Sequence, residues 1–198
     1  MKVLLNTLIG FLILFDACSQ QSIPKKEIYN EEFKWTIAIP EGFKNVSTKE
    51  WTKIQNKGLQ VLENTYNEEV INEVETIFVF KSDGVNYFEA NYQPFDTEID
   101  GDYIESCKYI NKMIYQPLKS QAPDMQMDTI SSTEVIDSLK FQKFEIEIKS
   151  SDSFVMKIVT FNRLFDKKDF SVNIMYNDKL KGSKMLDSWR NSKFGKEI

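Results

Sequence analysis

The sequence predicts an α+β domain in which one antiparallel sheet carries helices on both faces, as in an α/β/α sandwich. Several segments alternate apolar and polar residues with the period of two that is typical of half-buried strands. Three other segments repeat apolar residues at helical spacing, which predicts amphipathic helices. The strand-like segments after residue 125 follow one another through short turns, and short connections require antiparallel neighbours.

The first expected elements are a strand and a helix. Residues 33–39 alternate large apolar side chains with smaller or polar ones, and the Pro40-Glu41-Gly42 turn ends this strand. Ser47 and Glu50 have the spacing of a capping box, in which each side chain satisfies a free amide of the first helical turn. We expect a helix over residues 48–66 that buries one apolar stripe. The stripe consists of Trp51, Ile54, Gly58, Val61 or Leu62, and Tyr66.

A hairpin and a second helix are expected next. Residues 77–80 are apolar on both faces, which predicts a central strand that is covered on both sides. The Asp83-Gly84 turn signal and the alternating residues 86–93 indicate a hairpin that ends at Pro94. The second helix is expected over residues 101–116, with Pro117 at its limit. Its stripe consists of Tyr103, Cys107, Ile110 and Ile114.

The last part of the chain predicts a meander of strands and a closing helix. Residues 144–149 alternate apolar and charged side chains, and similar segments at 154–158 and 170–174 follow polar turns. The closing helix is expected over residues 179–190, with Met185, Leu186 and Trp189 facing the core. We expect Trp51 and Trp189 to be largely buried.

The N-terminus has the parts of a secretion signal. Lys2 precedes an apolar run over residues 3–15, which is shorter than the roughly 20 residues that span a bilayer. Ala17 is the small residue that a signal peptidase requires, and Cys18 directly after it resembles the bacterial lipobox. We therefore expect residues 1–17 to be a lipoprotein signal peptide and Cys18 to carry the lipid. The alternative is an ordinary signal that is cleaved near Ala17.

A tether and a single domain are expected after the signal. Residues 18–31 are mostly polar and lack periodicity, so we interpret them as a lipidated tether. Residues 32–198 have the length of one domain. Ser19 at the second position resembles outer-membrane sorting, which predicts a lipid-anchored protein on the periplasmic face of the outer membrane.

The composition argues against several classes of function. The signal segment holds one lysine and one aspartate, so the mature part keeps the net charge of −5. This acidic charge argues against nucleic-acid binding, which needs clustered lysines and arginines. The sequence has no histidine, which removes Ser–His and Cys–His nucleophiles and the usual zinc ligands. Cys107 is the only cysteine after Cys18, and we expect it to be a buried, small apolar residue. Without a glycine-rich phosphate loop, we expect no cofactor.

Residues 96–102 have the pattern of a possible metal site. Acidic residues at alternate positions followed by glycine resemble the first half of a calcium loop. The second half is missing, because Cys107 occupies the position of the closing glutamate. The other interpretation, which we favour, is a helix N-terminus capped by Asp100, with Asp102 and Glu105 near its positive end.

Two further patterns would suit an enzyme or a carrier. Glu145 and Glu147 lie on one face of a strand, as a glycosidase pair would, but a solvated sheet face shows the same alternation. Aromatic residues could line an apolar ligand groove, although strand aromatics mostly belong to the core. They are Trp35, Tyr87, Phe88, Tyr92, Phe161 and Tyr176.

The two ends of the domain resemble a known family. Residues 33–43 are similar to the opening strand and Pro-Glu-Gly turn of PsbP-like proteins, and Ser192-Lys193-Phe194 is similar to the end of their terminal helix. The composition also resembles that of a flavobacterial envelope lipoprotein. The resemblance implies an α/β/α fold and a binding or accessory role, and it brings no catalytic residue. We therefore expect a non-enzymatic module with a possible envelope protein partner. A carboxylate-based hydrolase and a carrier of a small apolar ligand are the alternatives.

Overall fold

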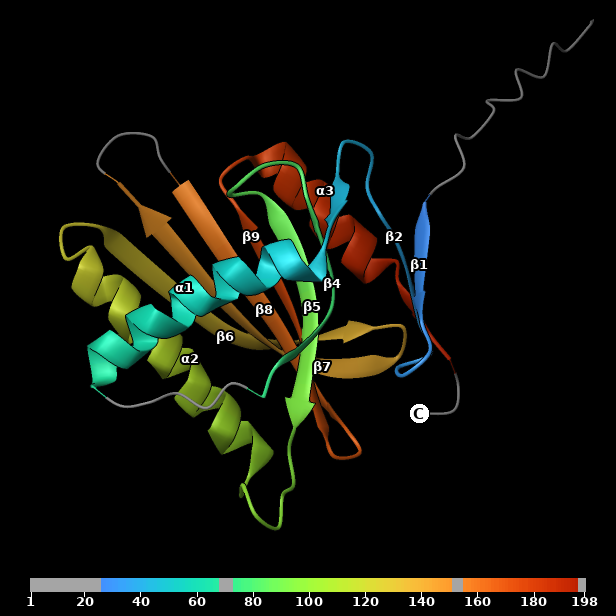
Figure 1. Cartoon of the computed structure of the whole chain (residues 1–198), viewed down its shortest axis with the longest axis horizontal. Coiled ribbons are helices and arrows are strands. Elements are labelled where there is room, and N and C mark those ends of the chain that lie inside the picture. Colours follow the sequence, from blue (N-terminus) through green and yellow to red (C-terminus); the bar gives the residue numbers. More distant parts are fainter. Residues whose placement is uncertain (1–25, 68–72, 151–154, 196–198) are drawn as a thin grey trace, which may run out of the picture.

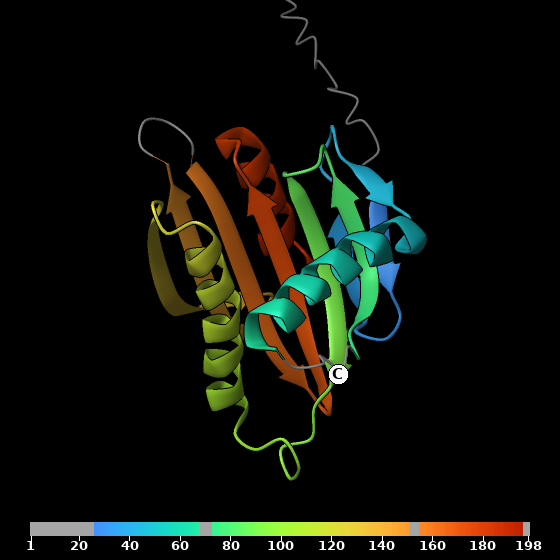
Figure 2. The ribbon, with the colours of Figure 1, turned by 60° about the vertical axis from the view of Figure 1, so that its left-hand side comes forward.

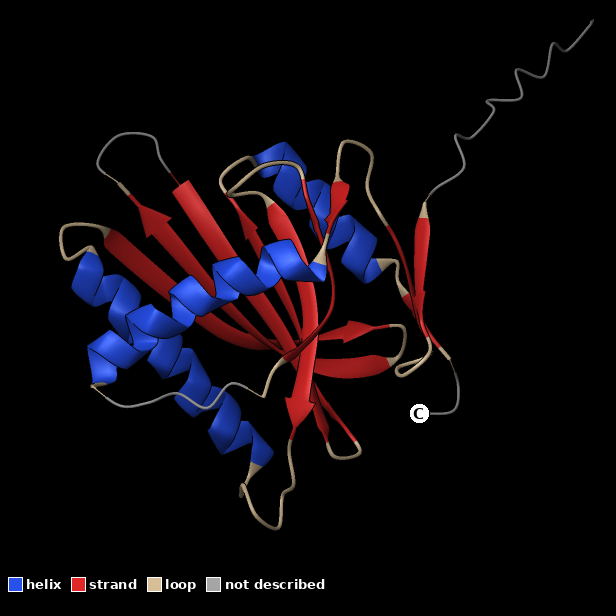
Figure 3. Ribbon diagram, in the orientation of Figure 1, coloured by secondary structure: helices blue, strands red, loops and turns tan. Residues whose placement is uncertain are grey.

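The fold is described from a computed structural model over residues 26–67, 73–150 and 155–195. These residues form three helices and antiparallel sheets, which confirms the predicted α+β class (Figure 3). The expected signal peptide over residues 1–17, the lipidation site Cys18 and the tether up to residue 25 lie outside the described residues.

The larger sheet has seven strands in the order β3-β4-β5-β9-β8-β7-β6, each antiparallel to its neighbours (Figure 1). The expected hairpin is the β4–β5 pair, and the expected meander runs from β6 to β9. Pairing of β5 with β9 joins the two into one sheet. The strands are β3 (Lys44–Val46), β4 (Glu75–Lys81), β5 (Tyr87–Pro94), β6 (Gln126–Ile136), β7 (Leu139–Lys149), β8 (Val155–Phe165) and β9 (Lys168–Tyr176).

A second sheet of three strands is a feature that we did not predict. It has the order β1-β2-β10, with β1 (Glu27–Asn30), β2 (Trp35–Ala38) and β10 (Lys193–Phe194). Residues 27–30 were assigned to the tether but pair with β2, and β2 itself was expected in the single large sheet. The reason is that segments near both ends of the described chain add to β2, so that Trp35 lies opposite both Asn30 and Phe194.

All three helices contact strands of the larger sheet (Figure 2). They are α1 (Thr48–Tyr66), α2 (Tyr103–Gln121) and α3 (Lys179–Arg190). In β8, the Phe161 ring lies 5.4 Å from the Trp189 ring of α3. Ile158, which faces the other way in the same strand, belongs to a cluster that includes Ile114 of α2. Within the described residues, no helix has both the length and the apolarity that crossing a bilayer requires.

The main core lies between the larger sheet, the smaller sheet and α3. Trp35, Phe170 and Trp189 have no exposed surface, and the Trp35 ring meets the other two edge-on at 5.3 and 5.8 Å. Each edge-to-face pair of this kind stabilises the fold by about 0.5–1.5 kcal/mol beyond the contribution of burying the rings. Trp51 is also buried, with 3% exposure, so the predicted burial of both tryptophans is confirmed.

Helix α1 has its predicted bounds but turns a different stripe toward the sheet. Ser47 caps it, accepting the Glu50 amide at 3.3 Å, as expected. Trp51 of the predicted stripe is buried, but the stripe is wrong at Ile54, which is 44% exposed while Gln55 faces the sheet. The surface beneath α1 is polar, so an amide side chain is favoured there over an apolar one.

Helix α2 differs from its prediction at both ends. Its N-cap is Asp102, which accepts the Glu105 amide at 2.9 Å, so the assignment of the cap to Asp100 is wrong. The helix also continues past the expected limit at Pro117 to Gln121. Proline inside a helix removes one hydrogen bond and crowds the carbonyl of the preceding turn. Burial of Pro117 and packing of Leu118 onto the sheet favour the extra turn in spite of this cost.

Candidate functional site

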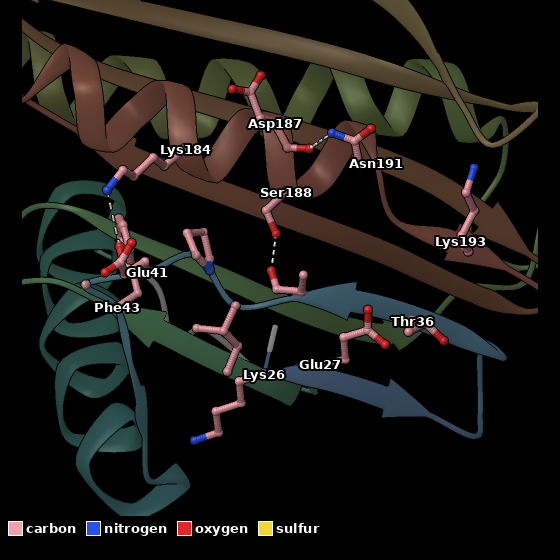
Figure 4. Close-up of a pocket in the computed structure, with 14 residues that line it drawn as sticks. Lys26, Glu27, Thr36, Glu41, Phe43, Lys184, Asp187, Ser188, Asn191 and Lys193 are labelled. Carbon is pink, nitrogen blue, oxygen red and sulfur yellow. Dashed lines mark hydrogen bonds between the residues drawn. The ribbon is translucent and has the colours of Figure 1, made fainter. Parts of the chain in front are cut away.

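A groove of about 660 Å³ lies between α3 and the smaller sheet (Figure 4), and we call it the α3 groove. Its floor is formed by β1, β2 and the turn that follows β2. Its wall is formed by α3 and β10. The lining residues are Lys26, Glu27, Thr36, Ala38, Ile39, Pro40, Glu41, Gly42, Phe43, Lys184, Asp187, Ser188, Asn191 and Lys193.

One face of α3 supplies a wall of the groove. Lys184, Ser188 and Asn191 recur at the spacing that places residues on the same side of a helix. The Ser188 hydroxyl points to β2 and donates to the Ala38 carbonyl (Figure 4). This hydrogen bond ties the helix to the floor and fixes the width of the groove at that point.

The turn after β2 closes one end of the groove. Phe43 donates its amide to the Pro40 carbonyl at 3.1 Å, and Gly42 has a φ of +89°, which side chains disfavour. The Lys184 ammonium reaches across to the Glu41 carbonyl at 3.4 Å. The Pro-Glu-Gly sequence therefore shapes the groove as well as ending the strand.

The α3 groove carries both signs of charge. Lys26, Lys184 and Lys193 are balanced by Glu27, Glu41 and Asp187. Lys193 is held at one end by an ion pair of 3.0 Å with Asp137. A balanced lining suits a polar protein surface, which presents both signs of charge, better than it suits a phosphate or an anionic lipid surface, where binding needs clustered cations.

A layer of polar side chains, which we call the polar layer, lies between the larger sheet and helices α1 and α2. These residues occupy one face of β5, β8 and β9, as their strand registers require. They are Glu89, Asn91, Gln93, Thr160, Asn162, Asp169 and Asn173.

Glu89 is a buried carboxyl of the polar layer, with 8% exposure. It accepts hydrogen bonds from the Trp51 indole at 2.6 Å and from the Gln55 amide at 3.0 Å. Burial raises the pKa of Glu89, and the hydrogen bonds from its neighbours oppose part of that rise. These contacts join α1 to the centre of the sheet.

Asp169 is the second buried carboxyl of the polar layer, with 3% exposure. It accepts a hydrogen bond of 2.7 Å from the Tyr103 hydroxyl of α2, and burial raises its pKa. Burial also raises the pKa of the neighbouring Cys107 thiol to about 11. The prediction of Cys107 as a buried residue is confirmed, and its thiol stays protonated at neutral pH.

The two buried carboxyls are too far apart to act as an acid–base pair. Glu89 lies opposite Asn173, and Asp169 is four residues further along β9. Four residues of strand span about 14 Å. Paired glycosidase carboxyls lie within about 5–9.5 Å of each other. Each carboxyl therefore anchors a different helix.

Glu145 and Glu147 are held by lysines rather than by each other. Lys157 lies between them, at 3.4 Å from Glu145 and 2.7 Å from Glu147. Hydrogen bonds from Lys149 and Lys157 lower the pKa of Glu147 to about 2. An ionised carboxylate cannot protonate a leaving group near neutral pH, so this arrangement matches the charged sheet face better than the hydrolase alternative.

In the acidic segment at 96–102, the carboxylates of Asp96 and Asp100 make local hydrogen bonds and an ion pair. Asp96 binds Lys167 at 2.6 Å and accepts the Glu98 amide at 3.0 Å. Asp100 accepts the Asp96 amide at 2.7 Å. Within the three described ranges, no group of three or more acidic or cysteine side chains is arranged to hold a metal ion.

The six aromatic residues do not converge on a common cavity. Trp35, Phe88 and Phe161 have no exposed surface and belong to the main core. Tyr87 packs edge-on against Trp51 at 4.9 Å, and Tyr92 donates to Glu75 at 2.7 Å. None of the six lines the α3 groove.

The sequence did not predict the α3 groove or the two buried carboxyls of the polar layer. The α3 groove combines positions from Lys26 to Lys193, which no local pattern connects. Glu89 and Asp169 look like ordinary polar positions of alternating strands. A signal for Glu89 was present in Phe88-Glu89-Ala90, where a carboxylate is flanked by residues that suit a buried strand.

Comparisons with known proteins support the architecture. The solution structure of cyanobacterial PsbP (CyanoP) from Synechocystis sp. PCC 6803 matches with a TM-score of 0.54. The match covers 91% of this chain and 99% of that chain. The fold is PsbP-like. At 8% sequence identity this similarity concerns the fold alone. No family model matches the sequence, and no curated protein matches it.

Proposed function

We propose that this protein is a non-enzymatic binding or accessory module of the bacterial cell envelope, anchored by a lipid at Cys18 on the periplasmic face of the outer membrane. Its PsbP-like domain would form an α/β/α sandwich, and the α3 groove would hold an envelope protein partner.

The α3 groove is the observation that carries this proposal. It is open to solvent and offers charged and amide side chains from α3 together with a rigid turn from residues 40–42. Its balanced charges are complementary to a polar protein surface rather than to nucleic acid.

The position of the groove near the expected anchor also supports the proposal. Lys26 lines the groove, and it lies only eight positions after Cys18 in the sequence. Eight residues span at most about 29 Å when fully extended. A lipid at Cys18 would therefore keep the groove close to the membrane, where an envelope partner would meet it.

Carboxylates that are already engaged make a hydrolase the weaker alternative. Glu145 and Glu147 are ion-paired, and Glu89 and Asp169 each hold a helix in place. A carrier of an apolar ligand is the other alternative: Ile39, Pro40 and Phe43 give the groove apolar surface, but Phe43 is its one aromatic residue and six charged side chains surround that surface.

Co-purification from the native envelope tests the proposal. The full-length lipoprotein with Lys184→Glu and Asp187→Lys reverses two groove charges while keeping the net charge. Lys179→Glu is the control for a charge reversal on the same helix, because Lys179 is exposed and does not line the groove. We expect one partner to be retained by the wild type and the control and to be reduced at least tenfold by the double variant. Equal retention in all three would contradict the assignment of the groove.

A further inference from the structure

The outer strands of the two sheets differ strongly in length. β3, β1 and β10, which end their sheets elsewhere, have 3, 4 and 2 residues. β6 ends the larger sheet with 11 residues, and no strand of the described chain pairs with its outer side. Natural proteins keep most exposed edges short, because free backbone donors and acceptors recruit another strand.

β6 is exposed on both faces as well as along its edge. Every side chain from Asp128 to Thr133 is exposed. Two of the exposed side chains of this strand are large and apolar: Ile130 is 60% exposed and Val135 is 65% exposed. They lie on opposite faces of the sheet because they are an odd number of residues apart.

Several of the usual protections of an edge strand are missing from β6, whose charged residues are Asp128 and Glu134. Its sequence, QMDTISSTEVI, contains no proline, lysine or arginine. Its register with β7 runs without a bulge from Gln126 to Ile136. A regular edge of this length is a template for an added strand.

We propose that β6 pairs antiparallel with β6 of a second copy of this chain, with a two-fold axis at Ile130. The axis would stand perpendicular to the sheet, and the two seven-stranded sheets would become one continuous sheet. This interface is distinct from the α3 groove, so it goes beyond the proposed function.

The sequence of β6 is complementary to itself in this register. Ile130 then lies opposite Ile130 of the second copy, which covers both exposed side chains. Asp128 lies opposite Ser132, and Glu134 lies opposite Gln126, so no two acids face each other. On the other face, Val135 lies opposite the half-buried Met125.

The neighbouring registers are disfavoured by charge. Directly opposed like charges destabilise a strand pair. A centre at Ser131 would place Asp128 opposite Glu134, and a centre at Thr129 would place Glu134 opposite Asp124. A centre at Ser132 would place Ile130 opposite Glu134 and leave its apolar surface without a partner.

Cysteine cross-linking of the full-length protein in its native membrane tests this register. Directly opposed residues of an antiparallel pair have Cα atoms about 4.5–5.5 Å apart, within the range of a disulfide. Ile130→Cys should therefore give a disulfide-linked dimer on mild oxidation. Ser132→Cys is the matched control: it lies on the same strand and face, but its counterpart would be about 14 Å away along the strand. The wild type controls for Cys18 and the buried Cys107.

A second measurement separates a failed cross-link from a missing dimer. Sedimentation of the detergent-extracted protein should give a dimer for the wild type and a monomer for Ser131→Pro, which removes a backbone donor from the strand. A thermal melt checks that the variant is folded. A monomeric wild type, a dimer linked through Ser132→Cys in place of Ile130→Cys, or a cross-link to a different protein would each overturn the proposal.

Discussion

The Trp51 indole N–H donates to a carboxylate oxygen of Glu89 across 2.6 Å and so joins α1 to β5. Glu89 is buried, and it also accepts a hydrogen bond from the Gln55 amide of α1 at 3.0 Å. A buried carboxyl depends on such donors, because an unpaired charge in the interior is costly. The attachment of α1 to the sheet should therefore depend on pH and on substitutions of Trp51 or Glu89.

The raised pKa of Glu89 predicts a loss of stability with rising pH. Because the folded state holds the proton more tightly, its contribution is complete below the unfolded pKa, near 4.5, and is lost as the pH rises through the folded pKa. Glu89→Gln removes this titration, so we expect a smaller fall in melting temperature between pH 5 and pH 8 than in the wild type. Asp169, whose pKa is raised in the same way, leaves part of the fall in place. Identical pH slopes in thermal melts of the two proteins would contradict this account.

Removal of the indole donor predicts coupling between Trp51 and Glu89. Trp51→Phe leaves the carboxylate without its shortest hydrogen bond and should lower the free energy of unfolding by about 1–3 kcal/mol, besides any packing loss. The loss should be smaller in the background of Glu89→Gln, because a neutral amide needs the donor less. A double-mutant cycle from urea unfolding measures the coupling. Strictly additive effects would show that the hydrogen bond contributes nothing.

Two glycines in helices predict opposite effects of alanine. A Cβ at Gly182 of α3 would overlap the Tyr176 ring, whereas a Cβ at Gly58 of α1 would meet nothing within 4 Å. Alanine is favoured over glycine in a helix interior by about 1 kcal/mol. Gly58→Ala should therefore stabilise the domain by up to that amount, and Gly182→Ala should destabilise it by about 1–3 kcal/mol. Chemical denaturation of both variants decides the matter, and a stabilised Gly182→Ala variant would mean that α3 packs differently on β9.

The engaged carboxylates at 96–102 predict that calcium does not stabilise the domain. A bound ion would compete with the Lys167 ammonium for Asp96 and with the backbone amide that Asp100 holds. We expect melting temperatures with millimolar calcium and with chelator to agree. A rise of several degrees with calcium that Asp100→Ala abolishes would instead identify a metal site.

The lipobox-like Ala17-Cys18 sequence predicts a lipid on Cys18. Cys18→Ala should leave an unprocessed precursor without acyl chains, because the modifying enzymes act on the thiol. Mass spectrometry of the envelope fraction measures both the cleavage and the added mass. The appearance of unmodified mature wild-type protein in the periplasm would contradict the anchor.

Local signals predicted the elements better than they predicted their assembly. The Ser47 cap, the Pro40-Glu41-Gly42 turn and the alternating strands depend on neighbours in sequence, and the described residues contain them. The smaller sheet depends on β1 and β10 meeting β2 from distant parts of the chain, which no local pattern encodes. Glu89 was not singled out, because its burial depends on Trp51 and Gln55 of α1, which are distant in sequence. The α3 groove could not be predicted from local patterns either, because its two walls come from distant parts of the chain and are joined only by tertiary contacts.

Site-specific photo-cross-linking in living cells tests the central claim, that the α3 groove holds an envelope protein partner. A photoreactive amino acid at position 184 of the full-length lipoprotein would sit in the groove, and the same group at position 179 would sit on the same helix outside it. We expect one discrete cross-linked protein from position 184 that is weak or missing from position 179. No cross-link from position 184, or the same pattern from both positions, would contradict the proposed binding site.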